Sequence, residues 1–264
     1  MISASKIFLI GAGYIGGEIL DLLLAEKYQV TALVRREAHA AELQALGAST
    51  VLGSLDDGDL LAQQASQSHI VIHSATADHQ QRAEPGQKAI YIHTSGASEL
   101  SDDAKGAFKS DKIAIVLPPA IYGVGSRGNR LSIQFPTMAR WVKKHGFAGH
   151  VGKGLSTWLL VHVADIAGGY LTILQWLEQS SSTDSITANP YFFGAAEIGK
   201  ALHAAGKLSL QNQGQSRRSC MVGKLGWQPK EKSTQRSLSE DEIPIILKEE
   251  TFSGYAAPVA FGAN

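Results

Sequence analysis

The sequence predicts an α/β fold built on a doubly wound parallel sheet, with a small C-terminal lobe. Short apolar runs recur through the first half of the chain, and segments with apolar residues at helical spacing separate them. The first of these runs ends in a glycine-rich loop. Apolar runs of about four to eight residues are typical of strands buried on both faces. Their alternation with helices favours a parallel sheet.

The composition agrees with an ordered globular protein. The chain has 264 residues, of which 44% are hydrophobic and 18% charged, so it buries a core without a disulfide or metal. Its 24 basic residues balance 24 acidic ones, which argues against nucleic acid or an anionic membrane as the main partner. The single cysteine, Cys220, excludes an internal disulfide and any multi-cysteine metal site. We expect a cytoplasmic protein with no metal, no membrane span and an undetermined oligomeric state.

The sheet and its flanking helices account for the first 123 residues, which we interpret as a dinucleotide-binding core. The expected strands cover residues 6–11, 28–34, 49–52, 69–75, 89–94 and 112–117. The expected helices cover residues 15–27, 37–46, 56–65 and 100–109. The connection 76–88 is short for a parallel crossover and contains Pro85 and Gly86, so we expect an irregular loop there.

Residues 124–264 are expected to form mostly a substrate lobe, with a segment at about 155–180 returning to the core. The expected helices cover residues 131–145, 165–179, 195–205 and 237–250. The expected strands cover residues 158–163 and 191–193, and the polar stretch 212–218 is expected to be mobile. Asp165 is expected to cap the helix that begins there.

The glycine-rich loop between the first strand and the first helix reads G-x-G-x-x-G. Gly11 permits a tight turn, Gly13 lets a pyrophosphate approach the backbone, and Gly16 lets the helix pack closely on the strand. The N–H groups at the helix start, around Tyr14 and Ile15, then bind phosphate oxygens. This pattern predicts a Rossmann-type dinucleotide site. The alternative is a structural turn with incidental glycines.

The end of the second strand should select the ribose of the dinucleotide. The sequence there carries Arg35 and Arg36, and an arginine fork matches the oxygens of a 2′-phosphate. NADP is therefore favoured as the cofactor. NAD stays an alternative, because Glu37 could bind a ribose hydroxyl or both arginines could be ordinary surface residues.

Six further motifs follow in order along the chain. They are G-S-L-D-D from Gly53, H-S-A from His73, H-T-S from His93, P-P-A-I-Y-G from Pro118, V-H-V-A-D-I-A from Val161 and L-G-W-Q-P from Leu225. Together with the glycine loop they resemble the short-chain dehydrogenase/reductase superfamily, in its extended, NAD-dependent epimerase-like and NmrA-like branches. The resemblance covers nearly the whole chain.

The resemblance implies roles for particular residues. Those that would contact the cofactor beyond the glycine loop and the arginines are Leu55, Asp56, Ser74, Ala75, Pro118 and Ile121. Asp56 matches the residue that holds the adenine amino group, and Ser95 matches the catalytic serine or threonine. The family's catalytic Tyr-x-x-x-Lys pair should follow Ser95, yet no tyrosine occurs between Tyr91 and Tyr122.

Other groups could manage the proton in place of that tyrosine. Tyr122 is the nearest remaining phenol, although it could equally pack beneath the P-P-A-I-Y-G turn. Asp78 and His79 could do acid–base work or simply belong to a surface loop.

Three functions fit the sequence. The first is an NADP-dependent reductase or epimerase-like enzyme that acts on a small organic substrate, including a secondary metabolite. The second is a cofactor-binding isomerase or cyclase without net redox chemistry. The third is an NmrA-like protein that senses the dinucleotide and signals to a protein partner.

Overall fold

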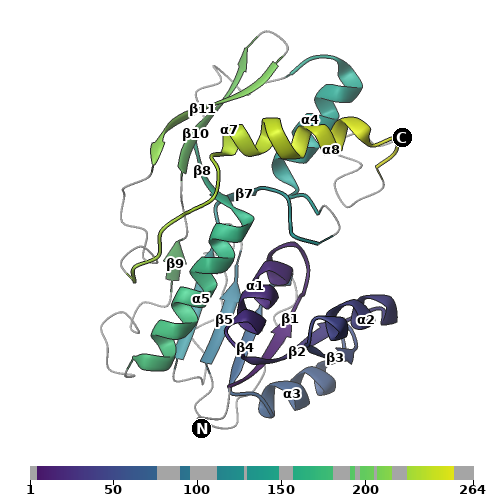
Figure 1. The fold of residues 1–264 in the computed structure, drawn as a ribbon, viewed down its shortest axis with the longest axis vertical. Helices are drawn as coiled ribbons and strands as arrows, with labels where there is room; N and C mark the ends of the chain where they lie inside the picture. Colours follow the sequence, from purple (N-terminus) through teal and green to yellow (C-terminus); the bar gives the residue numbers. More distant parts are fainter. Residues whose placement is uncertain are drawn as a thin grey trace. The chain divides into compact units, whose positions relative to one another are not determined.

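A computed structural model describes residues 5–75, 90–95, 112–127, 130–148, 157–180, 191–193, 197–204, 207–215 and 225–252 (Figure 1). The chain divides into two compact units. The first comprises residues 1–118, 167–194 and 221–227, and the second comprises residues 119–166, 195–220 and 228–264. Helix α5 (Val163–Gln179) begins in the second unit and continues in the first.

The first unit contains a seven-stranded sheet in the order β3-β2-β1-β4-β5-β6-β9. Its strands are β1 (Lys6–Ile10), β2 (Gln29–Val34), β3 (Ser49–Leu52), β4 (Ile70–His73), β5 (Ile90–Thr94), β6 (Lys112–Leu117) and β9 (Tyr191–Phe193). Every neighbouring pair is parallel, which confirms the doubly wound parallel sheet. The strand order reverses between β1 and β4, and ligands of such sheets bind at the carboxyl ends of the strands beside this point.

Helices α1 (Tyr14–Ala25), α2 (Glu37–Ala45) and α3 (Gly58–Ser66) follow the first three strands. Phe8, Ile10 and Val71 pack against Leu61 and Ala65 of α3, and all five are buried. Because side chains alternate along a strand, the neighbouring residues of β1, β4 and β5 point to the opposite face. Helices α1 and α5 cover that second face (Figure 1).

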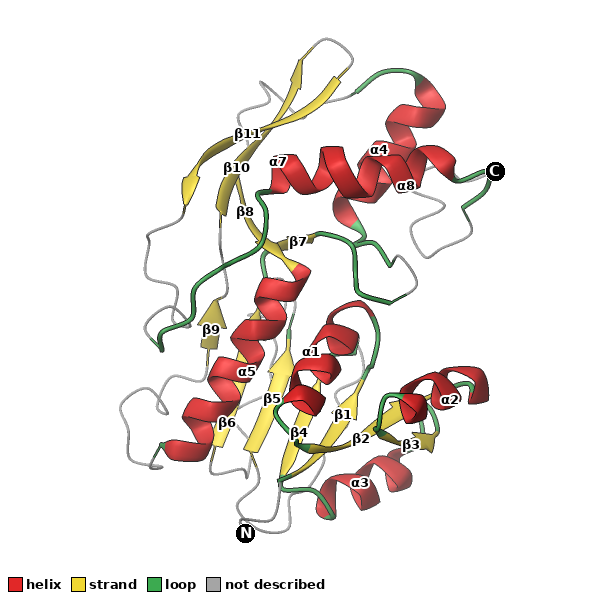
Figure 2. Cartoon of the chain, in the orientation of Figure 1, coloured by secondary structure: helices red, strands yellow, loops and turns green. Residues whose placement is uncertain are grey.

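The second unit contains a four-stranded sheet in the order β11-β10-β8-β7, together with helices α4, α7 and α8 (Figure 2). Its elements are β7 (Ala120–Tyr122), α4 (Gln134–His145), β8 (Thr157–His162), β10 (Glu197–Ala204), β11 (Lys207–Gln215), α7 (Thr234–Ser237), a π-helical turn (Leu238–Glu242) and α8 (Ile243–Lys248). Strand β7 pairs parallel with β8, and the other two pairs are antiparallel. Buried side chains of Tyr122, Phe135, Leu160 and Leu238 form its core.

One expectation for this unit is wrong. Residues 197–204 form strand β10 instead of a helix over 195–205, because they pair with β8 on one side and β11 on the other. Residues 212–215 of the polar stretch belong to β11, and residues 216–218 lie outside the described residues. Strand β7, inside the P-P-A-I-Y-G motif, was not expected from the sequence.

The expected helix 100–109 and the loop 76–88, with Asp78 and His79, lie outside the described residues. No helix in the described ranges is both long and apolar enough to cross a membrane. Across the same ranges, no group of three or more His, Cys, Asp or Glu side chains is arranged to hold a metal ion.

Candidate functional site

The glycine loop joins the end of β1 to the start of α1, and two of its glycines are required by the protein's own packing. Gly11 has φ +94°, and a Cβ there would lie 2.6 Å from the backbone nitrogen of Ala75. A Cβ on Gly16 would overlap the carbonyl oxygen of Gly11 and lie 2.5 Å from Oγ of Ser74. A side chain at either position would therefore force the backbone to shift.

Gly13 differs from these two glycines because none of the residues that the structure describes crowds it. A Cβ on Gly13 would lie 4.0 Å from its nearest neighbour, the carbonyl oxygen of Gly11, and the residue is exposed. Its own N–H donates to that same oxygen at 2.7 Å. Space next to Gly13 is therefore open on the outside of the loop, as close approach by a pyrophosphate requires.

Helix α1 begins directly after Gly13. Gly13 provides no side-chain cap, and the first turn contains no acidic residue. The first N–H groups of a helix have no partner within the helix, and they carry the positive end of its dipole. Tyr14 and Ile15 thus begin a helix whose start suits an anion such as a phosphate.

Ser74, which follows β4, holds the loop in place. Its backbone N–H donates to the carbonyl oxygen of Ile10 at 2.8 Å, and its hydroxyl donates to that of Gly11 at 2.9 Å. Both contacts join the end of β4 to the end of β1. Ser74 and Ala75 therefore hold the glycine loop in its shape through contacts within the protein. The motif match alone did not reveal this role.

Arg35 and Arg36 lie where β2 ends and α2 begins, and both are exposed. No hydrogen bond or ion pair ties either side chain to another residue in the described part of the chain. Glu37 occupies the first turn of α2. Two guanidinium groups at the carboxyl end of β2 are thus available to an anionic ligand.

The turn after β3 carries Leu55 and Asp56. The N–H of Ser54 donates to Oδ2 of Asp57 at 2.6 Å, and the N–H of Asp56 donates to Oγ of Ser54 at 3.1 Å. These bonds fix a tight turn that leaves Asp56 exposed, whereas Leu55 packs against the core on the α3 face. Asp56 is therefore accessible to a ligand, as its expected role requires.

Ser95 lies directly after β5, and it is 8% exposed. Its N–H donates to the carbonyl oxygen of Val116 at 3.0 Å, which fixes it to the neighbouring strand β6. Pro118 follows the end of β6. Because all these strands are parallel, Ser95 and Pro118 lie at the same edge of the sheet as the glycine loop and Arg35.

A buried hydroxyl pair lies beneath Ser95, and sequence reasoning missed it. Oγ1 of Thr94 and the hydroxyl of Tyr170 are 2.5 Å apart, and Tyr170 comes from α5. Burial raises the pKa of the Tyr170 hydroxyl, so it stays protonated. Tyr170 occurs at helical spacing with the buried residues Ile166, Ile173 and Leu177, which is the only sequence signal that it faces the sheet.

Two histidines lie at the ends of the central strands. His73 and His93 are register partners on β4 and β5, and their ring centroids are 5.0 Å apart. Tyr91 stacks on His93 at 6.1 Å, and burial raises the pKa of Tyr91 to about 12. His73 is almost fully buried. These rings therefore form part of the sheet's packing on the α3 face.

Tyr122 lies in the second unit and is only 1% exposed. Its hydroxyl donates to the carbonyl oxygen of Lys232 at 3.1 Å, and its ring meets the edge of His162 at 5.3 Å. Neighbouring Ile121 is buried as well. The phenol of Tyr122 is thus engaged within its own unit, which favours the packing interpretation over the catalytic one.

His162 caps the start of α5, since its Nδ1 accepts the N–H of Ala164 at 3.2 Å. Oδ1 of Asp165 accepts the N–H of Lys230 at 2.7 Å, so this carboxylate holds the segment after the L-G-W-Q-P motif. Burial raises the pKa of Asp165, although the N–H groups of Lys230 and Glu231 oppose that shift.

The chain is similar to known proteins in sequence. Residues 11–107 match a family model described as NAD(P)H-binding. An uncharacterized protein of Schizosaccharomyces pombe is 27% identical in an alignment 213 positions long, which covers 64% of this chain and 70% of that protein. The oxidase ucsJ of an Acremonium species is 28% identical in an alignment 233 positions long, which covers 64% of this chain and 66% of the oxidase.

Solved structures share the fold at low sequence identity. Gre2 of Candida albicans in complex with NADPH has a TM-score of 0.60 and 14% identity, covering 94% of this chain and 100% of that one. The UDP-glucose 4-epimerase of Thermotoga maritima has a TM-score of 0.57 and 14% identity, with coverages of 90% and 97%. Residues 11–107 thus match an NAD(P)H-binding family model, and the chain shares its fold with Gre2 and with the UDP-glucose 4-epimerase.

Proposed function

We propose that this protein is an NADP(H)-dependent oxidoreductase that acts on a small organic substrate. The observation that carries the proposal is the glycine loop. Gly11 and Gly16 are required by internal packing, whereas Gly13 is open and exposed at the start of an uncapped helix. A loop that packs tightly against β4 on one side and leaves open space beside Gly13 suits a dinucleotide pyrophosphate.

The preference for NADP(H) over NAD(H) rests on Arg35 and Arg36. Both are exposed at the end of β2, where the ribose of a dinucleotide lies in folds of this type. A guanidinium group binds a phosphate through two parallel charge-assisted hydrogen bonds. The NADPH complex of Gre2, which has the same fold, supports this choice.

The reaction we propose is hydride transfer from NADPH to the carbonyl carbon of an aldehyde or ketone, or in reverse from the carbinol carbon of the alcohol to NADP+. The nicotinamide supplies or accepts the hydride when it is bound. Ser95 would donate a hydrogen bond to the carbonyl oxygen, because it lies at the carboxyl edge of the sheet and β6 fixes its backbone. Tyr122 is buried and its hydroxyl is hydrogen-bonded to the carbonyl oxygen of Lys232, so we propose that it packs within the protein and takes no part in proton transfer. The proton for the substrate oxygen would come from water.

A direct test is to follow nicotinamide absorbance with a panel of small aldehydes and ketones. We expect oxidation of NADPH, and slower oxidation of NADH, with at least one of them. Native mass spectrometry of the purified protein would show whether a dinucleotide is retained. Product formed without any absorbance change would contradict the redox proposal and support an isomerase or cyclase.

A further inference from the structure

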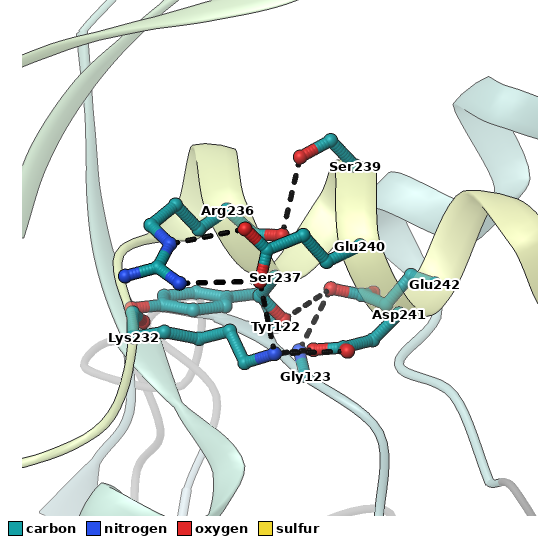
Figure 3. A network of polar contacts seen from close by, with 9 residues as sticks. All are labelled: Tyr122, Gly123, Lys232, Arg236, Ser237, Ser239, Glu240, Asp241 and Glu242. Atoms are coloured by element: carbon teal, nitrogen blue, oxygen red, sulfur yellow. Dashed lines mark hydrogen bonds and ion pairs between the residues drawn. The ribbon is translucent and has the colours of Figure 1, made fainter.

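Three acidic residues follow one another at the end of the π-helical turn, and their surroundings differ (Figure 3). Oε1 of Glu240 lies 3.1 Å from Nε of Arg236, and Oδ2 of Asp241 lies 2.7 Å from Nζ of Lys232. These two carboxylates are at the surface and each has a cation. Glu242 is fully buried, with 0% exposure.

Glu242 bridges two segments of the second unit through one of its oxygens. Oε1 accepts the backbone N–H of Gly123 at 3.0 Å and the hydroxyl of Ser237 at 3.2 Å (Figure 3). Oε2 is buried and has no hydrogen-bond partner among the described residues. A buried carboxylate with one oxygen unsatisfied and no cation is costly, whereas the neutral acid is much less so.

Among the described residues, no positively charged group faces Glu242 to compensate a negative charge on its carboxylate. The turn after β7 offers the N–H of Gly123, α7 offers the hydroxyl of Ser237, and the adjacent Asp241 is itself acidic. His162 also packs against Gly123, since a Cβ on Gly123 would overlap its imidazole. Burial raises the pKa of Glu242, and Asp241 raises it further, against the two hydrogen bonds that lower it.

We infer that Glu242 is a proton-operated latch: the neutral acid joins the π-helical turn to the Tyr122–Gly123 turn, and loss of its proton loosens that junction. The Tyr122–Gly123 turn has another contact with the C-terminal segment, before α7, where the hydroxyl of Tyr122 donates to the carbonyl oxygen of Lys232. That contact does not titrate with Glu242. The latch therefore acts locally on Gly123 and does not release the whole C-terminal segment.

The direction of the pH effect follows from linkage. A carboxyl group with a raised folded-state pKa binds its proton more tightly in the folded protein than in the unfolded chain. The stabilisation of the folded protein by this tighter proton binding is fully present below the ordinary glutamate pKa. It is lost as pH rises through the folded-state pKa of Glu242. Within that window, the latched form should lose about tenfold in population relative to the open form for each pH unit.

Amide hydrogen exchange at Gly123 tests the latch, because this N–H is donated to Glu242 itself. After correction for intrinsic exchange rates, protection in the wild type should fall as pH rises through the window. Glu242→Gln, which mimics the neutral acid, should keep protection independent of pH. Glu240→Gln is the matched control, with the same change at an exposed, ion-paired site in the same turn, and should behave like the wild type. Equal pH dependence in the wild type and Glu242→Gln would overturn the inference.

A second measurement needs no variant. In wild-type protein carrying 13C at the glutamate side-chain carboxyls, one resonance should titrate at a pH clearly above all the others. That resonance should belong to a solvent-protected group. If every glutamate titrates in the ordinary range, Glu242 is ionised and the latch does not exist.

Discussion

The hydroxyl of Ser74 donates a hydrogen bond to the carbonyl oxygen of Gly11 at 2.9 Å, so the end of β4 sets the shape of the glycine loop. The same oxygen atom of Ser74 would lie 2.5 Å from a Cβ on Gly16. The loop therefore has its shape before any ligand arrives. A preorganised loop loses little conformational entropy on binding.

The first prediction concerns Gly16. Gly16→Ala should destabilise the protein by about 1–3 kcal/mol, because the new methyl group would overlap the carbonyl oxygen of Gly11 and the backbone must move. Gly17→Ala is the matched control, since a Cβ at Gly17 has nothing within 4 Å. Urea unfolding followed by circular dichroism measures both variants. Equal stability of the two would show that the loop tolerates a side chain at Gly16.

The second prediction concerns Arg35. Its hydrogen bonds to a 2′-phosphate should contribute about 1.5–3 kcal/mol, which corresponds to a roughly tenfold to hundredfold preference for NADPH over NADH. Arg35→Ala should remove most of this preference. Arg36→Ala measures how much Arg36 contributes to it. Calorimetric titration with both nucleotides checks this. If the wild type binds NADPH and NADH equally, Arg35 is only a surface residue.

The third prediction concerns Ser95. Ser95→Ala should lower turnover by about tenfold or more with a substrate that the wild type reduces, because the carbonyl oxygen loses its hydrogen-bond donor. NADPH affinity should hardly change, since the proposed role involves the substrate only. Steady-state rates and a parallel NADPH titration separate the two effects. A variant as active as the wild type would remove Ser95 from the site.

The fourth prediction concerns alkaline stability. Burial raises the pKa values of Tyr28, Tyr91 and Tyr170, that of Tyr91 to about 12, and a hydrogen bond to Glu178 adds to the shift of Tyr28. The folded protein therefore binds these protons more tightly, so stability should fall as pH rises above about 10. Unfolding in this pH range releases protons, and their number sets how steeply the free energy of unfolding falls with pH. Tyr91→Phe should lower that number by up to about one. An unchanged slope between about pH 10 and 12 would contradict the burial of the Tyr91 hydroxyl.

Local sequence patterns were sufficient for the sheet of the first unit. The expected strands 49–52, 112–117 and 191–193 coincide with β3, β6 and β9, because each is a short apolar run bounded by turn residues. They were not sufficient for β10. Residues 197–204 are rich in good helix formers, yet pairing with β8 and β11 outweighs this weak preference. Gly199 within the segment, and the alternation of Leu208 and Leu210 beyond it, were the available signals.

The candidate site was predictable from the sequence only where a motif has a known local backbone geometry. The G-x-G-x-x-G pattern identified the loop, because Gly11 and Gly16 each answer a local steric requirement, whereas Gly13 leaves open space beside the loop. Tyr170 was not predictable as the partner of Thr94, since helical spacing says that it is buried but not which strand it meets. Glu242 gave no signal either. It lies in the π-helical turn directly after two acidic residues that are at the surface, and nothing in the local sequence distinguishes it from them.

The most direct test of the central claim is a calorimetric titration of NADPH into the wild type, Gly13→Val and Gly17→Ala. We expect the wild type and Gly17→Ala to bind NADPH alike, because Gly17 lies inside α1 with space around it. Gly13→Val should bind it more weakly by orders of magnitude and stay folded, since only the ligand needs the space beside Gly13. Equal NADPH affinity in Gly13→Val and the wild type, or no binding to the wild type, would contradict the assignment of the glycine loop as the dinucleotide site.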